Sequence, residues 1–274
     1  MIQIEYPAER LVDTQAAFDG VAGDYDGPRG NNALIQQMRR TMWNAITATL
    51  SPNAVLADLG CGTGLDAAYL GGRGFRVVAM DWSPEMVRQT LTRIRREGLG
   101  DQVSVRHLGI QDLTSLDAGP FDGMYSNLGA LNCVPDLGPV ARTCARLLRP
   151  GGRLIVSVIG RYCPWEGAFY LLKGRPARAF VRLRRGMIPV GLSDGTVWTR
   201  YYAPREFYQH FEEAFALARY RAMGLFSPPP YLIALHRKAK PLCSALARLD
   251  DRLGGLPLLR NAGDHFLMVL KKRD

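Results

Sequence analysis

A glycine-rich turn between an apolar run and a helical segment carries the clearest chemical pattern of this chain. Residues 58–64 read Asp-Leu-Gly-Cys-Gly-Thr-Gly and follow the apolar run 54–57, which predicts a short buried strand. Glycines at every second position let the backbone turn sharply and approach a ligand closely. The amides at the start of the helix predicted from residue 65 would then face that ligand with the positive end of the helix dipole. The spacing alone is also compatible with an ordinary tight strand-to-helix turn.

The end of a second predicted strand indicates what such a turn would bind. Residues 75–80 form a β-rich run that ends at Asp81, 17 residues after Gly64. An acidic side chain at this place can accept hydrogen bonds from the two hydroxyls of a ribose. Ser83 and Pro84 follow it as the cap and first-turn proline of a helix start. An isolated aspartate is usually a solvated loop residue, but together these features predict an adenosine-containing ligand.

Three further motifs follow the glycine turn in a definite order. They are residues 81–86 (Asp-Trp-Ser-Pro-Glu-Met), 121–127 (Phe-Asp-Gly-Met-Tyr-Ser-Asn) and 147–152 (Leu-Leu-Arg-Pro-Gly-Gly). With these four motifs the chain resembles the class I S-adenosylmethionine-dependent methyltransferases, in particular the small-molecule branch near the quinone-biosynthesis methyltransferases. The resemblance extends from about residue 18 to residue 159 and resumes at the C-terminus.

The resemblance implies a set of residues that bind S-adenosylmethionine. It implies that Gly60 and Gly62 approach the methionine portion and that Asp58 lies near its ammonium group. It also implies that Asp81 holds the ribose. Four further residues of the motifs are expected at the cofactor: Cys61, Gly64, Trp82 and Met86.

The resemblance also assigns residues to the adenine and the sulfonium. Ile110 and Gln111 are expected beside the adenine, and Asn127 near the sulfonium. Family members often have an aspartate at the adenine amino group where this chain has Gly109, so Gln111 is the alternative partner for that group. The segment around Tyr25 resembles the N-terminal segment in which a tyrosine closes over the cofactor. An ordinary helix end punctuated by glycines is the alternative interpretation of that segment.

The alternation of strand-like and helix-like segments predicts the scaffold. A helix over residues 31–50 precedes strands near 54–59, 75–80, 103–107, 121–126 and 152–159, and helices near 63–71, 84–96 and 136–148 separate most of them. This order predicts an α/β, doubly wound, Rossmann-like parallel sheet with right-handed crossovers. The resemblance adds a sixth strand near 215–226 and an antiparallel seventh over 266–270, inserted between the fifth and sixth. It therefore implies the seven-stranded class I methyltransferase fold.

The 274 residues are expected to form a single methyltransferase domain (1–274) with lid insertions. Residues 1–50 are expected to be an N-terminal helical cap and residues 51–159 the cofactor-binding half. Ligands in such sheets bind past the carboxyl ends of the strands, where the strand order reverses. The fifth strand ends on that side, and by the resemblance so does the sixth. Residues 160–203 and 227–264 are therefore expected to lie over an acceptor pocket on that face, together with the N-terminal helix.

Methyl transfer from a sulfonium is an in-line displacement in which a neutral thioether leaves. The protein mainly aligns the partners, and a base is needed only where the acceptor must lose a proton. His265 and Glu166 are the candidate catalytic bases, since strand direction places His265 beside the pocket and Glu166 lies at the start of the first lid. Arg161, Tyr202 and Tyr231 are the expected acceptor contacts. A structural role is the alternative for both candidate bases and both tyrosines.

An uneven positive charge marks residues 169–185. The formal net charge is +10, and no acidic residue occurs between Glu166 and Asp194. Six basic residues fall in that interval, interleaved with apolar ones: Lys173, Arg175, Arg178, Arg182, Arg184 and Arg185. Three interpretations stay open: a solvated helical face, a peripheral contact with an anionic membrane surface or acidic substrate, and nucleic-acid binding. Because no separate RNA-binding module is visible, nucleic acid is not an expected partner.

Length and composition are those of one large domain with a solid core, since 47% of the residues are hydrophobic. We find no run of about 18 apolar residues that would predict a membrane span, and residues 1–7 lack the basic and apolar regions of a signal peptide. The five cysteines, an odd number without Cys-x-x-Cys spacing, predict neither a zinc site nor a disulfide framework. We therefore expect a cytoplasmic protein that holds no metal. The resemblance implies in addition that it uses S-adenosylmethionine and releases S-adenosylhomocysteine.

Four functions are compatible with these features. The main one is methyl transfer from S-adenosylmethionine to a small molecule, either aromatic, quinone-like or a specialised metabolite. An RNA or protein methyltransferase and a non-catalytic S-adenosylmethionine-binding partner protein are the alternatives. A nicotinamide oxidoreductase is disfavoured, because Leu65 stands where its glycine fingerprint has the third glycine. The sequence identifies neither the acceptor atom, which can be oxygen, nitrogen or carbon, nor the oligomeric state.

Overall fold

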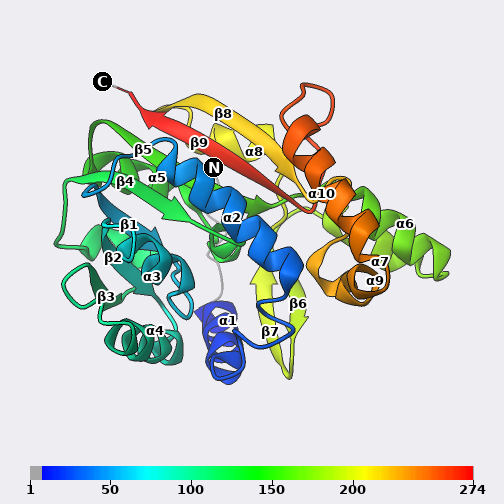
Figure 1. Ribbon diagram of the computed structural model, residues 1–274, viewed down its shortest axis with the longest axis horizontal. Helices are drawn as coiled ribbons and strands as arrows, with labels where there is room; N and C mark the ends of the chain where they lie inside the picture. Colours follow the sequence, from blue (N-terminus) through cyan, green and yellow to red (C-terminus); the bar gives the residue numbers. More distant parts are fainter. Residues whose placement is uncertain (1–7, 274) are drawn as a thin grey trace.

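A seven-stranded sheet organises the chain in the computed structural model, which describes residues 8–273 (Figure 1). Its strands are β1 (Val55–Leu59), β2 (Arg76–Asp81), β3 (Val103–His107), β4 (Phe121–Ser126), β5 (Leu148–Ile159), β8 (Phe215–Met223) and β9 (His265–Lys272). They lie in the order β3-β2-β1-β4-β5-β9-β8. The first five pair in parallel, and β9 is antiparallel to both β5 and β8. The doubly wound class I arrangement, with the last strand inserted between the fifth and sixth, is confirmed.

Helices cover both faces of this sheet, which is why its central strands are buried along nearly their whole length. On one face, α2 (Ala33–Thr47), α3 (Leu65–Gly71) and α4 (Pro84–Arg96) pack apolar side chains against the strands. On the other face lie α5 (Leu137–Leu147), α8 (Pro204–Gln209) and the short helices η1 (Ile110–Ser115) and η2 (Ala130–Cys133). In Figure 1, α2 crosses the front of the sheet and α5 lies behind it.

Local capping chemistry explains where the expected helices begin. Ser83 accepts a hydrogen bond from the backbone N–H of Met86 at 3.0 Å and caps α4, whose first residue is Pro84. The helix expected near residues 63–71 begins at Leu65, because Gly64 has φ +76° and is left-handed. A Cβ atom at Gly64 would lie 2.6 Å from Cγ2 of Thr90, so this position needs glycine for both reasons.

The expected N-terminal helical cap contains, besides α2, a helix whose bounds were not predicted. α1 (Ala8–Val21) packs against a hairpin made of β6 (Ile188–Leu192) and β7 (Gly195–Thr199). The contact is close, because a Cβ atom at Gly195 would lie 2.6 Å from Cβ of Ala17. The backbone N–H of Trp198 also donates to Oγ1 of Thr14 at 3.0 Å. Residues 1–7, which include the start of the expected cap and the segment tested for a signal peptide, lie outside the described residues.

Two excursions from the sheet fill the right-hand side of Figure 1. The first, residues 160–203, contains α6 (Pro164–Leu172), α7 (Pro176–Ala179), η3 (Val181–Leu183) and the β6–β7 hairpin. The second, residues 227–264, contains η4 (Pro230–Leu232), α9 (Ile233–Lys238) and α10 (Lys240–Leu253). Of the helices within residues 8–273, none has the length and apolar character needed to cross a membrane.

Arg182 joins the two excursions through a buried ion-pair cluster. Its Nε and Nη2 donate to the two carboxylate oxygens of Glu166 at 3.0 and 2.8 Å, and Nη2 also donates to Oδ1 of Asp264 at 2.7 Å. Its Nη1 donates to the backbone oxygens of Gly160 and Asp264. Burial raises the pKa of Asp264, but the charges of Arg182 and His265 outweigh it, so this pKa lies below its ordinary value.

We expect Arg182→Ala to lower the free energy of unfolding by about 3–5 kcal/mol, because it leaves two buried carboxylates without their counter-ion. Urea denaturation at neutral pH measures this loss. The matched control is Arg184→Ala, two residues along and exposed, which should change stability by less than about 0.5 kcal/mol. Equal stabilities of the two variants would contradict the anchoring role of Arg182.

Candidate active site

A cavity of about 280 Å³ lies past the carboxyl ends of β1, β2 and β4. The strand order reverses between β1 and β4, which is where open α/β sheets bind ligands. Its walls come from α1, α2, the glycine turn after β1, the ends of β2 and β4, and the β6–β7 hairpin. Segments far apart in the sequence therefore meet at one site.

The glycine turn brings bare backbone to the cavity. Gly60 and Gly62 have φ of +78° and +56°, and both line the cavity. A Cβ atom at Gly60 would lie 2.5 Å from Cβ of Ala130, so a side chain has no room there. Cys61 also lines the cavity, and burial raises the pKa of its thiol well above the ordinary value. Gly64 lies behind the turn and shapes it without lining the cavity.

Asp81 ties the end of β2 to the glycine turn. Its Oδ2 accepts the backbone N–H of Gly62 at 2.8 Å, and its Oδ1 accepts that of Ser83 at 2.9 Å. Burial raises the pKa of Asp81, and these amide hydrogen bonds offset part of the shift. A carboxylate has about four acceptor positions, so two remain for hydroxyl donors of a ligand. Trp82 and Met86, which follow Asp81, also line the cavity.

Tyr25 lies over the turn from the N-terminal side. Its Cε1 would be 3.8 Å from a Cβ atom at Gly62, and the residue lines the cavity. The neighbouring Asp26 accepts a hydrogen bond from Oγ1 of Thr63 at 2.8 Å and forms an ion pair with Arg93. The segment around Tyr25 is therefore fastened to both the turn and α4.

Asp58 is buried behind the turn, and only 1% of its surface is exposed. It does not line the cavity directly. Its Oδ2 has no hydrogen bond of good geometry within the part of the chain that the structure describes, although the hydroxyl of Tyr125 lies near enough to lower the pKa of Asp58. Burial, foremost, and the nearby charge of Asp66 raise the pKa of Asp58 well above its ordinary value. A cationic group placed near this carboxyl would favour its ionised form and lower its pKa.

A polar cluster at the same end of the cavity was not predicted from the sequence. Asp66 accepts hydrogen bonds from Nη1 of Arg39 at 2.6 Å, Nε1 of Trp43 at 2.7 Å and Nδ2 of Asn127 at 3.0 Å. Arg39, Asp66 and Asn127 all line the cavity. The i, i+4 spacing of Arg39 and Trp43 places them on one helix face. This spacing is the feature of the sequence that could have indicated a shared partner.

Ile110 and Gln111 also line the cavity. A Cβ atom at Gly109 would overlap the side chain of Gln111. The Gln111 side chain therefore occupies the space into which a side chain at position 109 would extend. The lack of a side chain at Gly109 therefore leaves room for the side chain of Gln111.

The remaining walls of the cavity are mainly apolar. α1 contributes Leu11 and Phe18, and the β6–β7 hairpin contributes Val190, Leu192 and Val197. The first excursion thus reaches the cavity, as expected, whereas no residue of 227–264 lines it in the described structure. That part of the expected acceptor lid instead packs at the end of β8, where Asp250 accepts hydrogen bonds from the backbone N–H groups of residues 225–227.

The structure does not bring the two candidate bases to the cavity. Glu166 is bound to Arg182, and Nδ1 of His265 lies 2.9 Å from Oδ2 of Asp264 in the same cluster. β9 does begin at the correct edge of the sheet, where His265 pairs with Ile159 at the end of β5, but β5 separates it from β4. Since neighbouring strands lie about 4.8 Å apart, that separation carries His265 roughly 10 Å sideways from β4.

The three expected acceptor contacts also lie away from the cavity walls. Nη2 of Arg161 forms an ion pair with Glu206 at 2.7 Å. Tyr202 is fully buried in the core beside α8. The hydroxyl of Tyr231 donates to Glu166 at 3.1 Å, so this residue belongs to the Arg182 cluster. Within residues 8–273, no group of three or more His, Cys, Asp or Glu residues is arranged to hold a metal ion.

Comparison with known proteins agrees with this geometry. Residues 57–156 match a family described as "Methyltransferase domain". The "Ubiquinone biosynthesis O-methyltransferase" of Xanthomonas axonopodis pv. citri (strain 306) is 34% identical over 151 residues, which are 55% of this chain and 61% of that protein. The protein of the same name from Xylella fastidiosa (strain 9a5c) is 39% identical over 150 residues, or 55% and 59% of the two chains. The chain spans about three fifths of the length of these curated relatives.

Two solved structures share the fold. The 1,6-didemethyltoxoflavin-N1-methyltransferase of Burkholderia thailandensis, with 1,6-didemethyltoxoflavin and S-adenosylhomocysteine bound, has a TM-score of 0.61 at 18% identity, covering 100% of this chain and 93% of that one. A putative methyltransferase in complex with the Haloferax volcanii Trm112 methyltransferase activator has a TM-score of 0.61 at 17% identity, covering 94% and 98%. Residues 57–156 thus match a methyltransferase domain, and the chain has the fold of the class I S-adenosylmethionine-dependent methyltransferases.

The raised pKa of Asp58 generates a pH prediction. In the free protein the carboxyl stays protonated above its ordinary pKa of about 3.9. A bound ammonium group favours the ionised form, so binding of S-adenosylhomocysteine should release a proton. Affinity should therefore rise with pH through the raised pKa and level off above it. Calorimetry between about pH 5 and pH 8, in two buffers of different ionisation enthalpy, measures affinity and proton release.

Asp58→Asn should bind more weakly and flatten that profile, leaving the smaller contribution of Asp81, whose pKa is also raised. Asp101→Asn, on an exposed residue, is the matched control and should keep the original profile. An affinity that does not change with pH in the unaltered protein would refute the placement of an ammonium beside Asp58.

Proposed function

We propose that this chain transfers a methyl group from S-adenosylmethionine to a small-molecule acceptor by in-line displacement. The observation that carries the proposal is a single cavity at the reversal of strand order, with buried charges at one end and apolar walls elsewhere. That division of polarity suits a zwitterionic, adenosine-bearing cofactor beside an apolar acceptor. The methyltransferase domain and its ubiquinone-biosynthesis relatives support the same conclusion.

The residues at the polar end fit the amino-acid portion of the cofactor. The Arg39 guanidinium has donors, Nε among them, without a hydrogen-bond partner in the described structure, and they suit a carboxylate. Oδ2 of Asp58 likewise lacks a hydrogen bond of good geometry and suits an ammonium group. Unpaired buried polar atoms cost about 1–3 kcal/mol each, so a ligand that pairs them gains affinity.

The other cofactor contacts follow the motifs. Asp81 would accept the ribose hydroxyls, and the bare backbone of Gly60 and Gly62 would lie along the methionine portion. Gln111 would bind the adenine amino group, which is supported by the way its side chain fills the space beside Gly109. Tyr25 would cover the cofactor, and Asn127 would lie near the sulfonium.

S-adenosylmethionine, when bound, supplies an electrophilic methyl group attached to a good leaving group. The protein then has to hold the acceptor in line and exclude water, and such alignment can contribute about 7–11 kcal/mol. α1 and the β6–β7 hairpin supply apolar walls for this purpose. Cys133, which lines that side, has its thiol pKa raised to about 12 by burial, so it is not a base at neutral pH. The proposed reaction therefore does not use Cys133 as a base.

These walls favour an aromatic or quinone-like acceptor, because the residues that line the cavity from α1 and the hairpin are mainly apolar. We assign the protein to a reducing cytoplasm, supported by the five cysteine thiols, all of which are unpaired. We also propose that residues 169–185 contact an anionic membrane surface. There Leu172 is 90% exposed and Phe180 52%, among exposed basic residues, so the apolar side of this segment is not buried on the domain.

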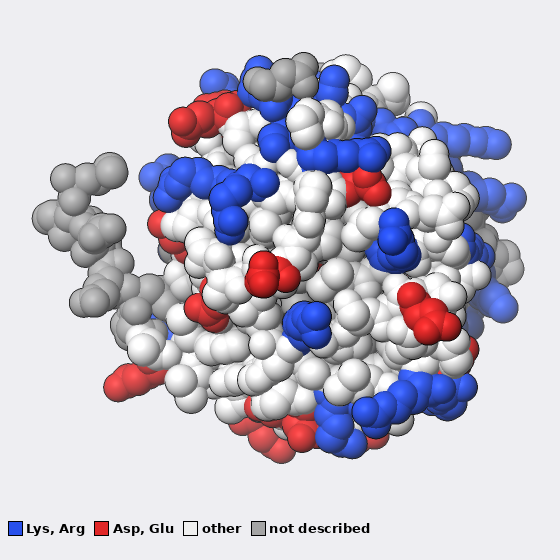
Figure 2. Space-filling model, turned by 90° about the vertical axis from the view of Figure 1, so that its left-hand side faces the viewer, with Lys and Arg blue, Asp and Glu red and all other residues white. Residues whose placement is uncertain are grey.

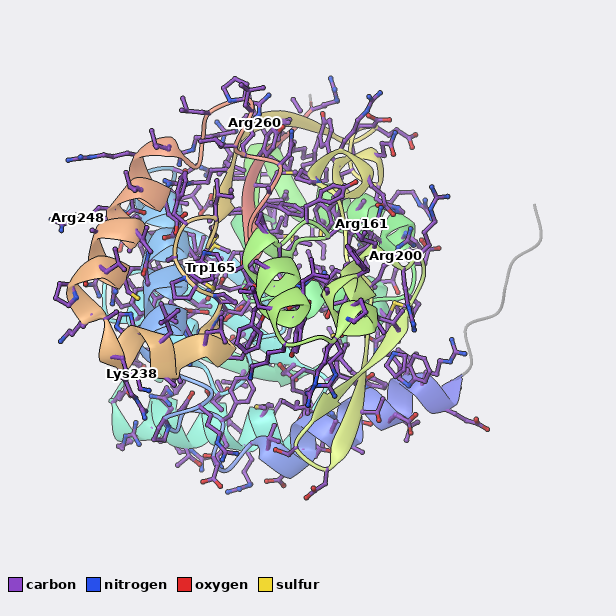
Figure 3. All side chains as sticks on the ribbon, turned by 90° about the vertical axis from the view of Figure 1, so that its right-hand side faces the viewer. Arg161, Trp165, Arg200, Lys238, Arg248 and Arg260 are labelled. Carbon is purple, nitrogen blue, oxygen red and sulfur yellow. The ribbon has the colours of Figure 1, made fainter. Side chains whose placement is uncertain are left out.

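The proposed membrane face includes α7 and lies beside α9 and α10 (Figure 3), from which Lys238 and Arg248 extend outward. On the side that carries β3 and α4, acidic and basic side chains are interspersed instead (Figure 2). We expect the protein to sediment with phosphatidylglycerol vesicles and not with phosphatidylcholine vesicles. Each cation near such a surface contributes about 1 kcal/mol.

A variant with four exposed arginines replaced by serine should lose this binding: Arg175, Arg178, Arg184 and Arg185. The control replaces Arg95 and Arg96 on α4 by serine and should still bind, corrected for its smaller loss of charge. Equal sedimentation of all three proteins would argue against a contact through this face.

Methyl transfer is tested by incubating the protein with methyl-labelled S-adenosylmethionine and a small-molecule extract of its source cells. Mass spectrometry should find one labelled small molecule whose formation needs the protein. Asp81→Ala should reduce cofactor affinity by about 1–3 kcal/mol, through loss of charge-assisted hydrogen bonds. The exposed Asp101→Ala should behave as the unaltered protein. Cofactor binding without a labelled small molecule would favour a non-catalytic protein, and label in RNA or protein a macromolecular substrate.

A further inference from the structure

We propose that Asp66 is a positioning residue that orients Arg39 toward the amino-acid portion of the cofactor and secures Asn127, which follows β4 and would lie near the sulfonium. The proposal rests on the proposed function, because it assigns a role within the same site. It follows from one juxtaposition: a single buried carboxylate accepts hydrogen bonds from side chains of α2 and of the loop after β4.

Asp66 uses its acceptor positions within the protein. Its Oδ2 accepts from Nη1 of Arg39 at 2.6 Å and from Nδ2 of Asn127 at 3.0 Å, and its Oδ1 accepts from Nε1 of Trp43 at 2.7 Å. Three of about four acceptor positions are therefore occupied. The carboxylate is better placed to hold its neighbours than to bind a ligand itself.

The Arg39–Asp66 ion pair is almost fully buried, with 7% and 6% of the two side chains exposed. Such a pair depends on geometry, because two charges out of water are stable only when each is compensated. Fixing Nη1 on Asp66 restricts the whole planar guanidinium to one orientation. The other donors of Arg39 are then presented to a carboxylate without further ordering of a long side chain.

Asn127 is fixed from both sides. Its Oδ1 accepts hydrogen bonds from Oγ of Ser157 at 2.8 Å and from the backbone N–H of Leu128 at 2.9 Å, while its Nδ2 donates to Asp66. Leu128 has φ +54°, an uncommon conformation for a leucine, and it lines the cavity next to Asn127. Asp66 thus also secures the loop that follows β4.

A pair of ligands separates this role from a general effect on the fold. S-adenosylhomocysteine contains the amino-acid portion, whereas 5′-methylthioadenosine has the adenosine and a thioether but lacks that portion. We expect Asp66→Asn, which keeps the side-chain shape but sets an NH₂ group against donors, to weaken S-adenosylhomocysteine binding at least about tenfold. Binding of 5′-methylthioadenosine should stay within about twofold. Asp117→Asn, on an exposed residue, is the matched control for both ligands.

A double-mutant cycle with Arg39→Gln tests whether Asp66 acts through Arg39. Arg39→Gln alone should weaken S-adenosylhomocysteine binding and not that of 5′-methylthioadenosine. In the double variant, the total loss of S-adenosylhomocysteine affinity should be smaller than the product of the two single losses. If Asp66→Asn does not fold, Trp43→Phe serves instead. It removes one hydrogen bond to Asp66, keeps an aromatic ring beside Tyr69 and should give a smaller loss, about threefold.

Equal weakening of both ligands, or no weakening of either, would overturn the positioning role. A fully additive cycle would also overturn it, because Asp66 would then act independently of Arg39. Failure of the unaltered protein to bind S-adenosylhomocysteine is a different result, which would refute the proposed function itself.

Discussion

The structure depends on a steric constraint at the turn after β1. A side chain at Gly60 would collide with Ala130, and one at Gly64 with Thr90, so the backbone can pass only as glycine with positive φ. The backbone of this turn also donates a hydrogen bond to Asp81 at the end of β2. The bare backbone and the carboxylate are therefore one unit, which explains why the two features occur together in the sequence. The cavity exists because this unit lies where the strand order reverses.

The walls of the cavity differ in polarity because different kinds of side chain are buried in each. Charged groups gather where α2 and α3 meet the sheet, and there Asp66 and Arg39 compensate each other. The opposite wall comes from α1 and the β6–β7 hairpin, whose apolar residues need no partners. A zwitterion and an apolar acceptor can thus occupy one cavity without either leaving a charge unpaired.

Features that depend on neighbouring residues were predictable from the sequence. The strands, the start of α4 at Pro84 and the place of Asp81 follow from local periodicity, capping and spacing. Contacts between distant segments were not. Asp66 lies 27 residues from Arg39, and Trp198 lies 184 residues from its partner Thr14. His265 shows the same difficulty, since its strand was expected at the correct edge, yet only the packed sheet shows how far β5 and β9 lie from the turn.

The first excursion has one part exposed to solvent and another part buried against the rest of the molecule. Its beginning exposes Leu172 and Phe180 to solvent, whereas its end buries the hairpin against α1. Arg182 lies between them and is bound to Glu166, to Asp264 and to the backbone of Gly160, which belong to both excursions and the end of β5. The hairpin therefore starts from a point fixed to the sheet, only six residues after Arg182. A contact made by the exposed half can orient the molecule on a surface while the wall of the cavity keeps its shape.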